Sequence, residues 1–232
     1  CRKPTITCTD SGGTSLLDRS EFAQGRASTL SDVMAYAPGV FAQTRHGDET
    51  RLSIRGSGIQ RGFLLRGLAL YQDGIPLNHA DGSGDFQSID PLAAQYVEIW
   101  RGANALEYGG NTLGGAVNFV SPTGRTAPPV TARAEAGSFG HRLGHVSLAG
   151  ANERADGFFS LTHNRQDGYR KHSATEATRF SGNAGARLTD HLDIRFFLSH
   201  LDSKLQMPGS LTQAALNADP RQAAPNYERL YA

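Results

Sequence analysis

The sequence has no long apolar run. No stretch of about 18 consecutive apolar residues occurs, which excludes a membrane-spanning helix. Charge is also scarce: Asp, Glu, Lys and Arg make up 19% of the chain, and the formal net charge is +1. A balance this close to neutral gives no electrostatic basis for nucleic-acid binding. The strands of a membrane barrel show only alternating hydrophobicity, so that class of protein stays open.

Cysteine is nearly absent. Cys1 and Cys8 are the only two, and both lie near the start of the chain. We expect them either to have no role or to form a local disulfide in an oxidising compartment. Lipid anchoring of Cys1 is a further alternative that rests on its position alone. The sequence starts without Met or a signal peptide, so we expect a processed or excised segment.

No pattern of catalytic or metal-binding residues stands out. Ser, His and Asp are plentiful, but no nucleophile elbow occurs. The glycines of Gly56 to Gly62 have the wrong spacing for a dinucleotide loop. Asp81 to Asp85 lacks the distal Glu of a calcium loop, and no third ligand accompanies His141 and His145. We therefore predict a protein that is not an enzyme and has no cofactor.

Short strands that end at glycine or at an Asp-Gly turn dominate the region from Arg51 to Pro122. Glycine makes positive φ angles and close backbone approach inexpensive at such points. A helix is expected before them, from an N-cap at Thr29 to Pro38-Gly39, with Asp32 completing a capping box. A second, shorter helix should start at Asp90-Pro91. The glycine-ended segments are Arg51-Leu52-Ser53-Ile54-Arg55-Gly56, Leu70-Tyr71-Gln72-Asp73-Gly74, Val97-Glu98-Ile99-Trp100-Arg101-Gly102 and Tyr108 to Val120.

The pattern changes after the proline-rich segment 123–129. Apolar and polar residues alternate in five consecutive segments between residues 130 and 201, each roughly 9–10 residues long, as a tilted membrane strand requires. Short polar connections at 152–156 and 189–191 differ from a longer connection at 165–178. Bacterial barrels have short periplasmic turns and longer outer loops, so the first strand should run outward.

The motifs between residues 30 and 122, in their order and in their residues, resemble the plug domain of TonB-dependent outer-membrane receptors. The resemblance implies a mainly β chain in which an α+β plug domain, a small mixed sheet with short helices, precedes a transmembrane β-barrel. We predict a flexible N-terminal arm at 1–21, a plug at 22–122, a linker at 123–129 and the N-terminal part of a barrel at 130–232. Such barrels have about 22 strands, so five antiparallel strands would form an incomplete barrel.

The resemblance also implies function, partners and site residues. The expected function is uptake of a scarce ligand across the bacterial outer membrane, energised by the TonB protein. A ferric siderophore or other ferric chelate is the leading ligand; cobalamin, haem, other metal chelates and glycans stay open. The expected residues are Gln60, Arg61, Asn78, His79 and Asp81 for the ligand, Arg55 and Arg101 for barrel glutamates, and Thr5, Ile6 and Thr7 for TonB.

A different class of function competes with this interpretation. A soluble or surface-attached β-rich binding module, without transport activity, would also carry alternating strands and glycine-rich turns. The two hypotheses differ in where the apolar side chains of residues 130–200 point. In a barrel they face lipid and the polar side chains face the plug, whereas in a module Phe159, Ile194 and Phe196 would pack into an interior of their own.

Overall fold

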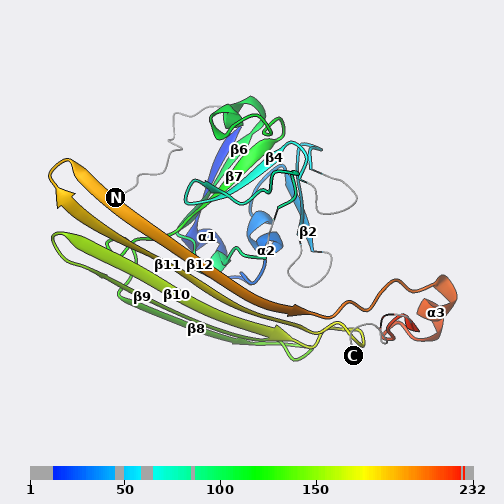
Figure 1. Ribbon diagram of the computed structural model, residues 1–232. Helices are drawn as coiled ribbons and strands as arrows, with labels where there is room; N and C mark the ends of the chain where they lie inside the picture. The colour runs from blue at the N-terminus through cyan, green and yellow to red at the C-terminus, as the bar shows by residue number, and fades with distance from the viewer. Residues whose placement is uncertain (1–12, 45–49, 59–64, 85–86, 226, 228–232) are drawn as a thin grey trace.

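The computed structural model describes residues 13–44, 50–58, 65–84, 87–225 and 227 (Figure 1). The chain is mainly β, with a small mixed sheet and short helices followed by a long antiparallel sheet. This arrangement confirms the predicted fold class. We call residues 13–122 the N-terminal domain and the five strands between residues 130 and 205 the long sheet.

A five-stranded mixed sheet forms the centre of the N-terminal domain. Its strand order is β1-β6-β7-β4-β5, in which β4 and β7 are parallel and the other pairs are antiparallel. A separate hairpin packs beside it. The bounds are β1 (Thr14–Asp18), β4 (Leu68–Gln72), β5 (Ile75–Pro76), β6 (Tyr96–Arg101) and β7 (Gly115–Val120), with β2 (Val40–Thr44) and β3 (Thr50–Ile54) in the hairpin.

The helices begin at the caps that the sequence indicates. Helix α2 (Leu30–Met34) has Thr29 as N-cap, and Asp32 completes a capping box. The 3-10 helix η1 (Pro91–Ala93) starts at Asp90, whose Oδ1 accepts the backbone N–H of Leu92 at 3.0 Å. Both expected helix starts are therefore confirmed. The other helices are α1 (Arg19–Phe22), η2 (Gly102–Tyr108) and, near the end of the chain, α3 (Gln213–Ala218).

An apolar core holds the helices, the hairpin and the mixed sheet together. Phe22 of α1, Met34 of α2 and Ile54 of β3 are each 0% exposed and belong to one cluster with Ile99 of β6. Burying a side chain of this size contributes about 1.5–3 kcal/mol. The domain therefore has its own core, in addition to any support from the long sheet.

The start of the chain differs from the sequence expectation. Residues 1–21 were expected to form a flexible arm, but Thr14–Asp18 is strand β1 and pairs along its length with β6. Leu17 is 3% exposed and fixes this strand to the core, and Asp18 caps helix α1. The expectation is wrong for residues 14–21 because one buried leucine and a backbone ladder are enough to order so short a segment. Residues 1–12 lie outside the described residues.

The long sheet is a meander of five antiparallel strands. Its order is β12-β11-β10-β9-β8, so each strand pairs with its neighbour in sequence. The bounds are β8 (Val130–Ala136), β9 (Arg142–Ala151), β10 (Ala155–Gln166), β11 (Thr175–Thr189) and β12 (Leu192–Leu205). Strands β10, β11 and β12 have 12, 15 and 14 residues and are longer than the sequence pattern suggested, whereas β9 has 10 and β8 has 7.

The two faces of the long sheet differ in chemistry. The face toward the N-terminal domain buries polar side chains, including His145, Thr162 and Arg179. The opposite face exposes large apolar side chains: Val146, Leu148, Phe159, Leu161, Phe196 and Leu198 are each at least 40% exposed. The rings of Phe159 and Phe180 stack on this outer face. The predicted alternation is confirmed, and the outer apolar side chains have no interior of their own.

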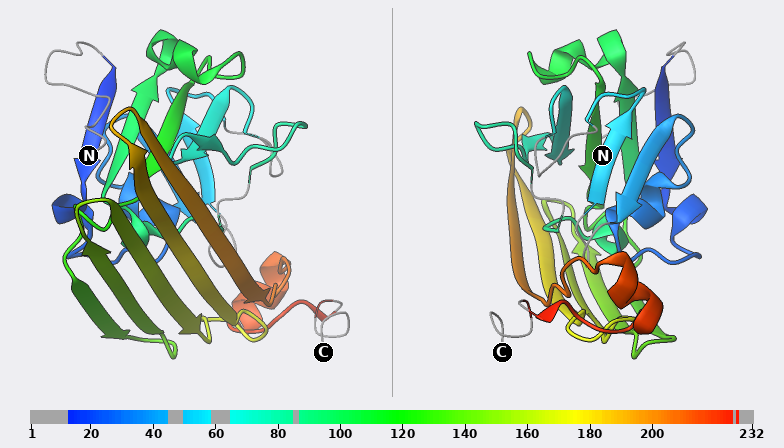
Figure 2. Two further views of the ribbon diagram at one scale, coloured as in Figure 1. Left: turned by 60° about the vertical axis from the view of Figure 1, so that its left-hand side comes forward. Right: turned by 90° about the vertical axis from the view of Figure 1, so that its right-hand side faces the viewer.

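The N-terminal domain lies against only one face of the curved long sheet (Figures 1 and 2). The short turns at residues 152–154 and 190–191 lie at one end of the sheet, which we call the turn end. The loop 167–174 and helix α3 lie at the other end, which we call the loop end (Figure 1). Residues 121–129 connect the domain to the sheet at the turn end.

Candidate functional site

The expected ligand residues divide into three groups. Gln60 and Arg61 lie outside the described residues. Asn78 braces the fold: its Oδ1 accepts the backbone N–H of Leu70 at 2.6 Å, and its Nδ2 donates to the carbonyl of Leu68 at 3.2 Å. Its polar atoms are therefore committed to strand β4. Only His79 and Asp81 present exposed side chains among the described members of the set.

The loop that carries His79 and Asp81 is held in a defined turn. The backbone N–H of His79 donates to the carbonyl of Ser83 at 2.8 Å. Asp81 accepts from the N–H of Ser83 at 2.9 Å and from its hydroxyl at 2.6 Å. These two hydrogen bonds lower the pKa of the Asp81 carboxyl. The loop thus presents a charged carboxylate and an imidazole on a pre-formed turn.

Arg101 has a different set of partners from those that the resemblance implied. It is 7% exposed, and its guanidinium donates to Ser15 Oγ at 2.9 Å and to the carbonyl of Pro38 at 2.6 Å. Burial, and secondarily the charge of Arg55, lower the Arg101 pKa. Arg101 therefore joins β1 to the α2–β2 connection inside the N-terminal domain. Arg55 is exposed, with a φ of 53°.

The expected TonB-contacting residues Thr5, Ile6 and Thr7 also lie outside the described residues. Where the structure describes the chain, no three His, Cys, Asp or Glu side chains form a group able to hold a metal ion. The helices found in the same residues are too short and too polar to cross a membrane.

Sequence reasoning missed a line of hydrogen bonds between the long sheet and the N-terminal domain. In each, a side chain of the sheet donates to an acceptor on the domain. Buried polar groups without partners are costly, so these bonds fix where the domain sits. They are Arg133 to the carbonyls of Ala23 and Gly25, Thr162 to Asp90, Arg179 to the carbonyl of Gln87, and Asn183 to the carbonyl of Pro122.

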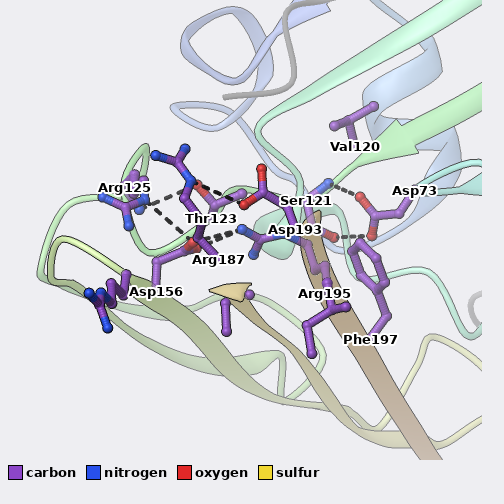
Figure 3. A pocket seen from close by; sticks show the side chains of 14 residues that line it. Asp73, Val120, Ser121, Thr123, Arg125, Asp156, Arg187, Asp193, Arg195 and Phe197 are labelled. Atoms are coloured by element: carbon purple, nitrogen blue, oxygen red, sulfur yellow. Dashed lines mark hydrogen bonds and ion pairs between the residues drawn. The ribbon is translucent and has the colours of Figure 1, made fainter. Parts of the chain in front are cut away.

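A second cluster holds the connection between the two units at the turn end (Figure 3). Asp156 of β10, with a side chain 6% exposed, accepts from Arg195 at 2.8 and 2.9 Å and from the backbone N–H of Gly124 at 3.1 Å. Arg125 lies 3.5 Å from the same carboxylate. Buried carboxylates require such partners. The cluster borders a cavity of about 360 Å³ between the domain and the sheet.

Gly124 fits closely against the long sheet. Gly150 and Gly157 lie directly opposite each other on β9 and β10. A Cβ added to Gly124 would lie 2.1 Å from the carbonyl oxygen of Gly150 and 2.5 Å from the nitrogen of Gly157. Only glycine fits at position 124 without a backbone shift. The sequence did contain a signal, since these three glycines are available, but nothing in it shows that they meet.

At the loop end, a clamp joins the loop 167–174 to the segment after β12. The guanidinium of Arg170 donates to the carbonyl of Gly209 at 2.7 Å and to that of Gln222 at 2.9 and 3.0 Å. Tyr169 packs edge-on against Phe139 and lies under the guanidinium of Arg221. The loop end therefore carries an ordered surface of aromatic and cationic side chains.

Comparison with known proteins shows what the chain resembles. Residues 10–116 match the TonB-dependent Receptor Plug Domain family. Curated relatives include the Vitamin B12 transporter BtuB of Vibrio vulnificus, 23% identical over 199 residues (77% of this chain, 32% of the relative). The Rhizobactin receptor of Rhizobium meliloti is 30% identical over 156 residues (57% and 21%), and the Ferric aerobactin receptor of Escherichia coli 27% over 175 residues (71% and 22%).

Solved structures show the same fold. The ferric citrate transporter FecA in its unliganded form matches with a TM-score of 0.74 at 22% identity, covering 92% of this chain and 34% of that one. The siderophore receptor PirA from Acinetobacter baumannii matches with a TM-score of 0.61 at 17% identity (82% and 31%). The chain thus spans about a third or less of the length of these relatives.

Proposed function

The chain carries, over residues 10–116, a domain of the TonB-dependent receptor plug family, and from this premise we propose that it forms the plug and part of the barrel wall of an outer-membrane receptor. The receptor takes up a scarce ligand with energy delivered through the TonB protein. In this proposal the N-terminal domain is the plug, the long sheet is wall, and the protein is not an enzyme.

The single observation that carries the proposal is the division of the long sheet into two faces. Its inner face gives buried polar side chains to the N-terminal domain, and its outer face exposes phenylalanine and leucine. Soluble proteins rarely expose an apolar surface of this kind to water, whereas the outer face of a membrane barrel is apolar because it contacts lipid. A plug on the inner face and lipid on the outer face together account for both.

The sheet edges support placement within a larger wall. Strand β8 pairs only with β9, and strand β12 only with β11, among the described strands. An open edge cannot be satisfied in a membrane, because no water is available to replace the missing partner. We propose that further strands of the same wall pair with both edges. A soluble module would instead require these edges to be in contact with water.

The ligand in this proposal is a ferric siderophore or a similar ferric chelate. Support comes from relatives whose names refer to such ligands, including a ferric aerobactin receptor. The loop end presents Tyr169 and Arg221, and the domain presents His79 and Asp81. Cationic side chains attract an anionic chelate through charge-assisted hydrogen bonds. Cobalamin is the alternative that the BtuB relative raises.

Uptake assays in an iron-limited host that lacks its own siderophore receptors test this function. Cells that produce the protein should grow on one or more ferric siderophores, and growth should require TonB. Growth on cobalamin alone would show that cobalamin, not a ferric chelate, is the ligand. Growth without TonB would overturn the proposal that TonB energises uptake.

The TonB contact has its own test. We propose that Thr5, Ile6 and Thr7 add a strand to TonB, because β-branched residues favour extended pairing. Substituting Ile6→Pro removes a backbone N–H from such a strand. Uptake should then fall while ligand binding to cells is retained. Equal uptake by the Ile6→Pro variant and the unsubstituted protein would place the TonB contact elsewhere.

A further inference from the structure

A buried relay of three side chains connects the N-terminal domain to the long sheet. Thr162 Oγ1 on β10 donates to Asp90 Oδ2 at 2.6 Å, and His145 Nδ1 on β9 lies 2.7 Å from Thr162 Oγ1. All three residues are at most 4% exposed. Neither the plug resemblance nor the arginine–glutamate pairs it implied account for this contact, in which the domain supplies the carboxylate.

The protons in the relay have one consistent arrangement. Thr162 has a single hydroxyl proton, and it points to the Asp90 carboxylate. The imidazole of His145 must therefore donate from Nδ1 to the Thr162 oxygen. Its Nε2 is buried and without a hydrogen-bond partner among the described residues. The carboxylate of Asp90 and the guanidinium groups of Arg19 and Arg133 all lie close enough to interact electrostatically with His145.

Asp90 is well suited to receive this hydrogen bond. Its other oxygen, Oδ1, already caps helix η1 by accepting the N–H of Leu92 at 3.0 Å. Arg19, packed nearby on α1, interacts favourably with the ionised carboxylate. Both carboxylate oxygens are therefore acceptors, and the hydrogen bond from Thr162 ties the start of η1 directly to strand β10.

The long sheet repeats the same histidine–threonine pair on its other face. His163 lies opposite Thr178 on β10 and β11, just as His145 lies opposite Thr162 on β9 and β10. The His163 Nδ1 to Thr178 Oγ1 distance is 3.0 Å, and this pair faces away from the N-terminal domain. Both pairs join a histidine and a threonine directly across two neighbouring strands. Only the inner pair reaches the N-terminal domain.

From this geometry we propose that the hydrogen bonds among Asp90, Thr162 and His145 hold the plug in place against the wall. We call these three residues the latch. Thr162 makes the contact, and His145 is a positioning residue that turns the hydroxyl proton toward Asp90. The role of the latch in uptake rests on the proposed function, because these hydrogen bonds must break when the plug moves. Its existence as a seating contact does not depend on the ligand.

Hydrogen exchange of the full-length protein in detergent tests the latch. The variants are Thr162→Val, which keeps the shape and removes the hydroxyl, Thr162→Ser, which keeps the hydroxyl, and Thr178→Val as the matched control. Loss of a buried hydrogen bond to a charged group corresponds to at least about tenfold faster local opening. We expect this acceleration in peptides covering residues 87–95 for Thr162→Val only, with Thr162→Ser close to wild type.

Membrane leakage provides the second readout. Cells carrying Thr162→Val should become more sensitive to vancomycin, a large hydrophilic antibiotic, because a loosely seated plug leaves the lumen open. Should that variant fail to assemble, Asp90→Asn keeps the helix cap through its amide oxygen and places an N–H donor where Oδ2 accepts the Thr162 hydroxyl. The bond from Thr162 is then lost, and the same changes should appear. Equal exchange in Thr162→Val and Thr178→Val would overturn the latch, whereas loss of TonB-dependent uptake would bear on the proposed function separately.

Discussion

The side-chain amide of Asn183 on β11 donates to the carbonyl oxygen of Pro122 at 2.8 Å, where the N-terminal domain ends. Its amide oxygen accepts from Arg195 at 2.5 Å, and Arg195 in turn holds Asp156. Asp156 accepts the N–H of Gly124. One network thus holds the connection between the two units at residues 122 and 124.

The tight fit of Gly124 gives the first prediction. Gly124→Ala should destabilise the protein by about 1–3 kcal/mol, because the new methyl group would overlap the backbone of β9 and β10. Gly150→Ala is the matched control, since a Cβ there meets nothing within 4 Å. Thermal unfolding in detergent measures both. A melting temperature unchanged by Gly124→Ala would show that the connection does not lie against the sheet.

The buried guanidinium of Arg101 gives the second prediction. Arg101→Leu should cost about 2–4 kcal/mol, since charge-assisted hydrogen bonds to Ser15 and Pro38 are lost and their acceptors are left unpaired. Arg55→Ala, at an exposed position, should change stability by less than about 0.5 kcal/mol. Urea unfolding of the two variants compares them. Similar losses for both would mean that Arg55, too, has a structural role.

The turn around Asp81 gives a prediction about pH. Hydrogen bonds from Ser83 lower the Asp81 pKa in the folded loop. A lowered folded pKa means that the turn is stabilised above the unfolded pKa and that this contribution is lost as pH falls through the folded value. An NMR titration of the Asp81 carboxyl should show a pKa below the usual value of about 3.9. Ser83→Ala should raise it toward that value; no response would remove Ser83 as the cause.

The loop-end clamp gives a prediction about proteolysis. Arg170→Lys keeps the charge but loses the planar fork that reaches the carbonyls of Gly209 and Gln222. The segment 206–224 should then be cleaved several-fold faster by a protease of low specificity. Arg165→Lys serves as control, because Arg165 is exposed and its ion pair with Asp167 is long, at 3.8 Å. Equal cleavage rates would show that the clamp does not order this segment.

Local sequence rules predicted much of the fold. The capping box of Thr29 and Asp32, the Asp73-Gly74 turn and the two-residue periodicity of the long sheet depend on neighbouring residues, and each is confirmed. Strand β2 and strand β1 were missed because neither alternates clearly over its five residues. Their order comes from pairing with partners distant in sequence, which a single sequence does not reveal.

The contacts between the two units were the least predictable part. Thr162 and Asp90 are 72 positions apart, and Asn183 and Pro122 are 61 apart. Asp90 was identified as a helix cap, which uses only one of its oxygens. Asn78 was expected to bind ligand, but it braces β4, because an amide in a glycine-rich loop looks the same in sequence whether or not its polar atoms are already bonded.

Whether the outer face of the long sheet contacts lipid decides whether the sheet is barrel wall, and spin labels measure this contact. Cys1 and Cys8 are first replaced by serine. Single cysteines at Phe159 and Phe196 on the outer face, and at Ser160 and Ser181 on the inner face, are then labelled with a nitroxide in the full-length protein reconstituted in bilayers. Collisions with oxygen report contact with lipid, and collisions with a water-soluble nickel chelate report contact with water. We expect high oxygen and low nickel accessibility at 159 and 196, and low values of both at 160 and 181. High nickel accessibility at 159 and 196 would contradict the assignment of the sheet as barrel wall.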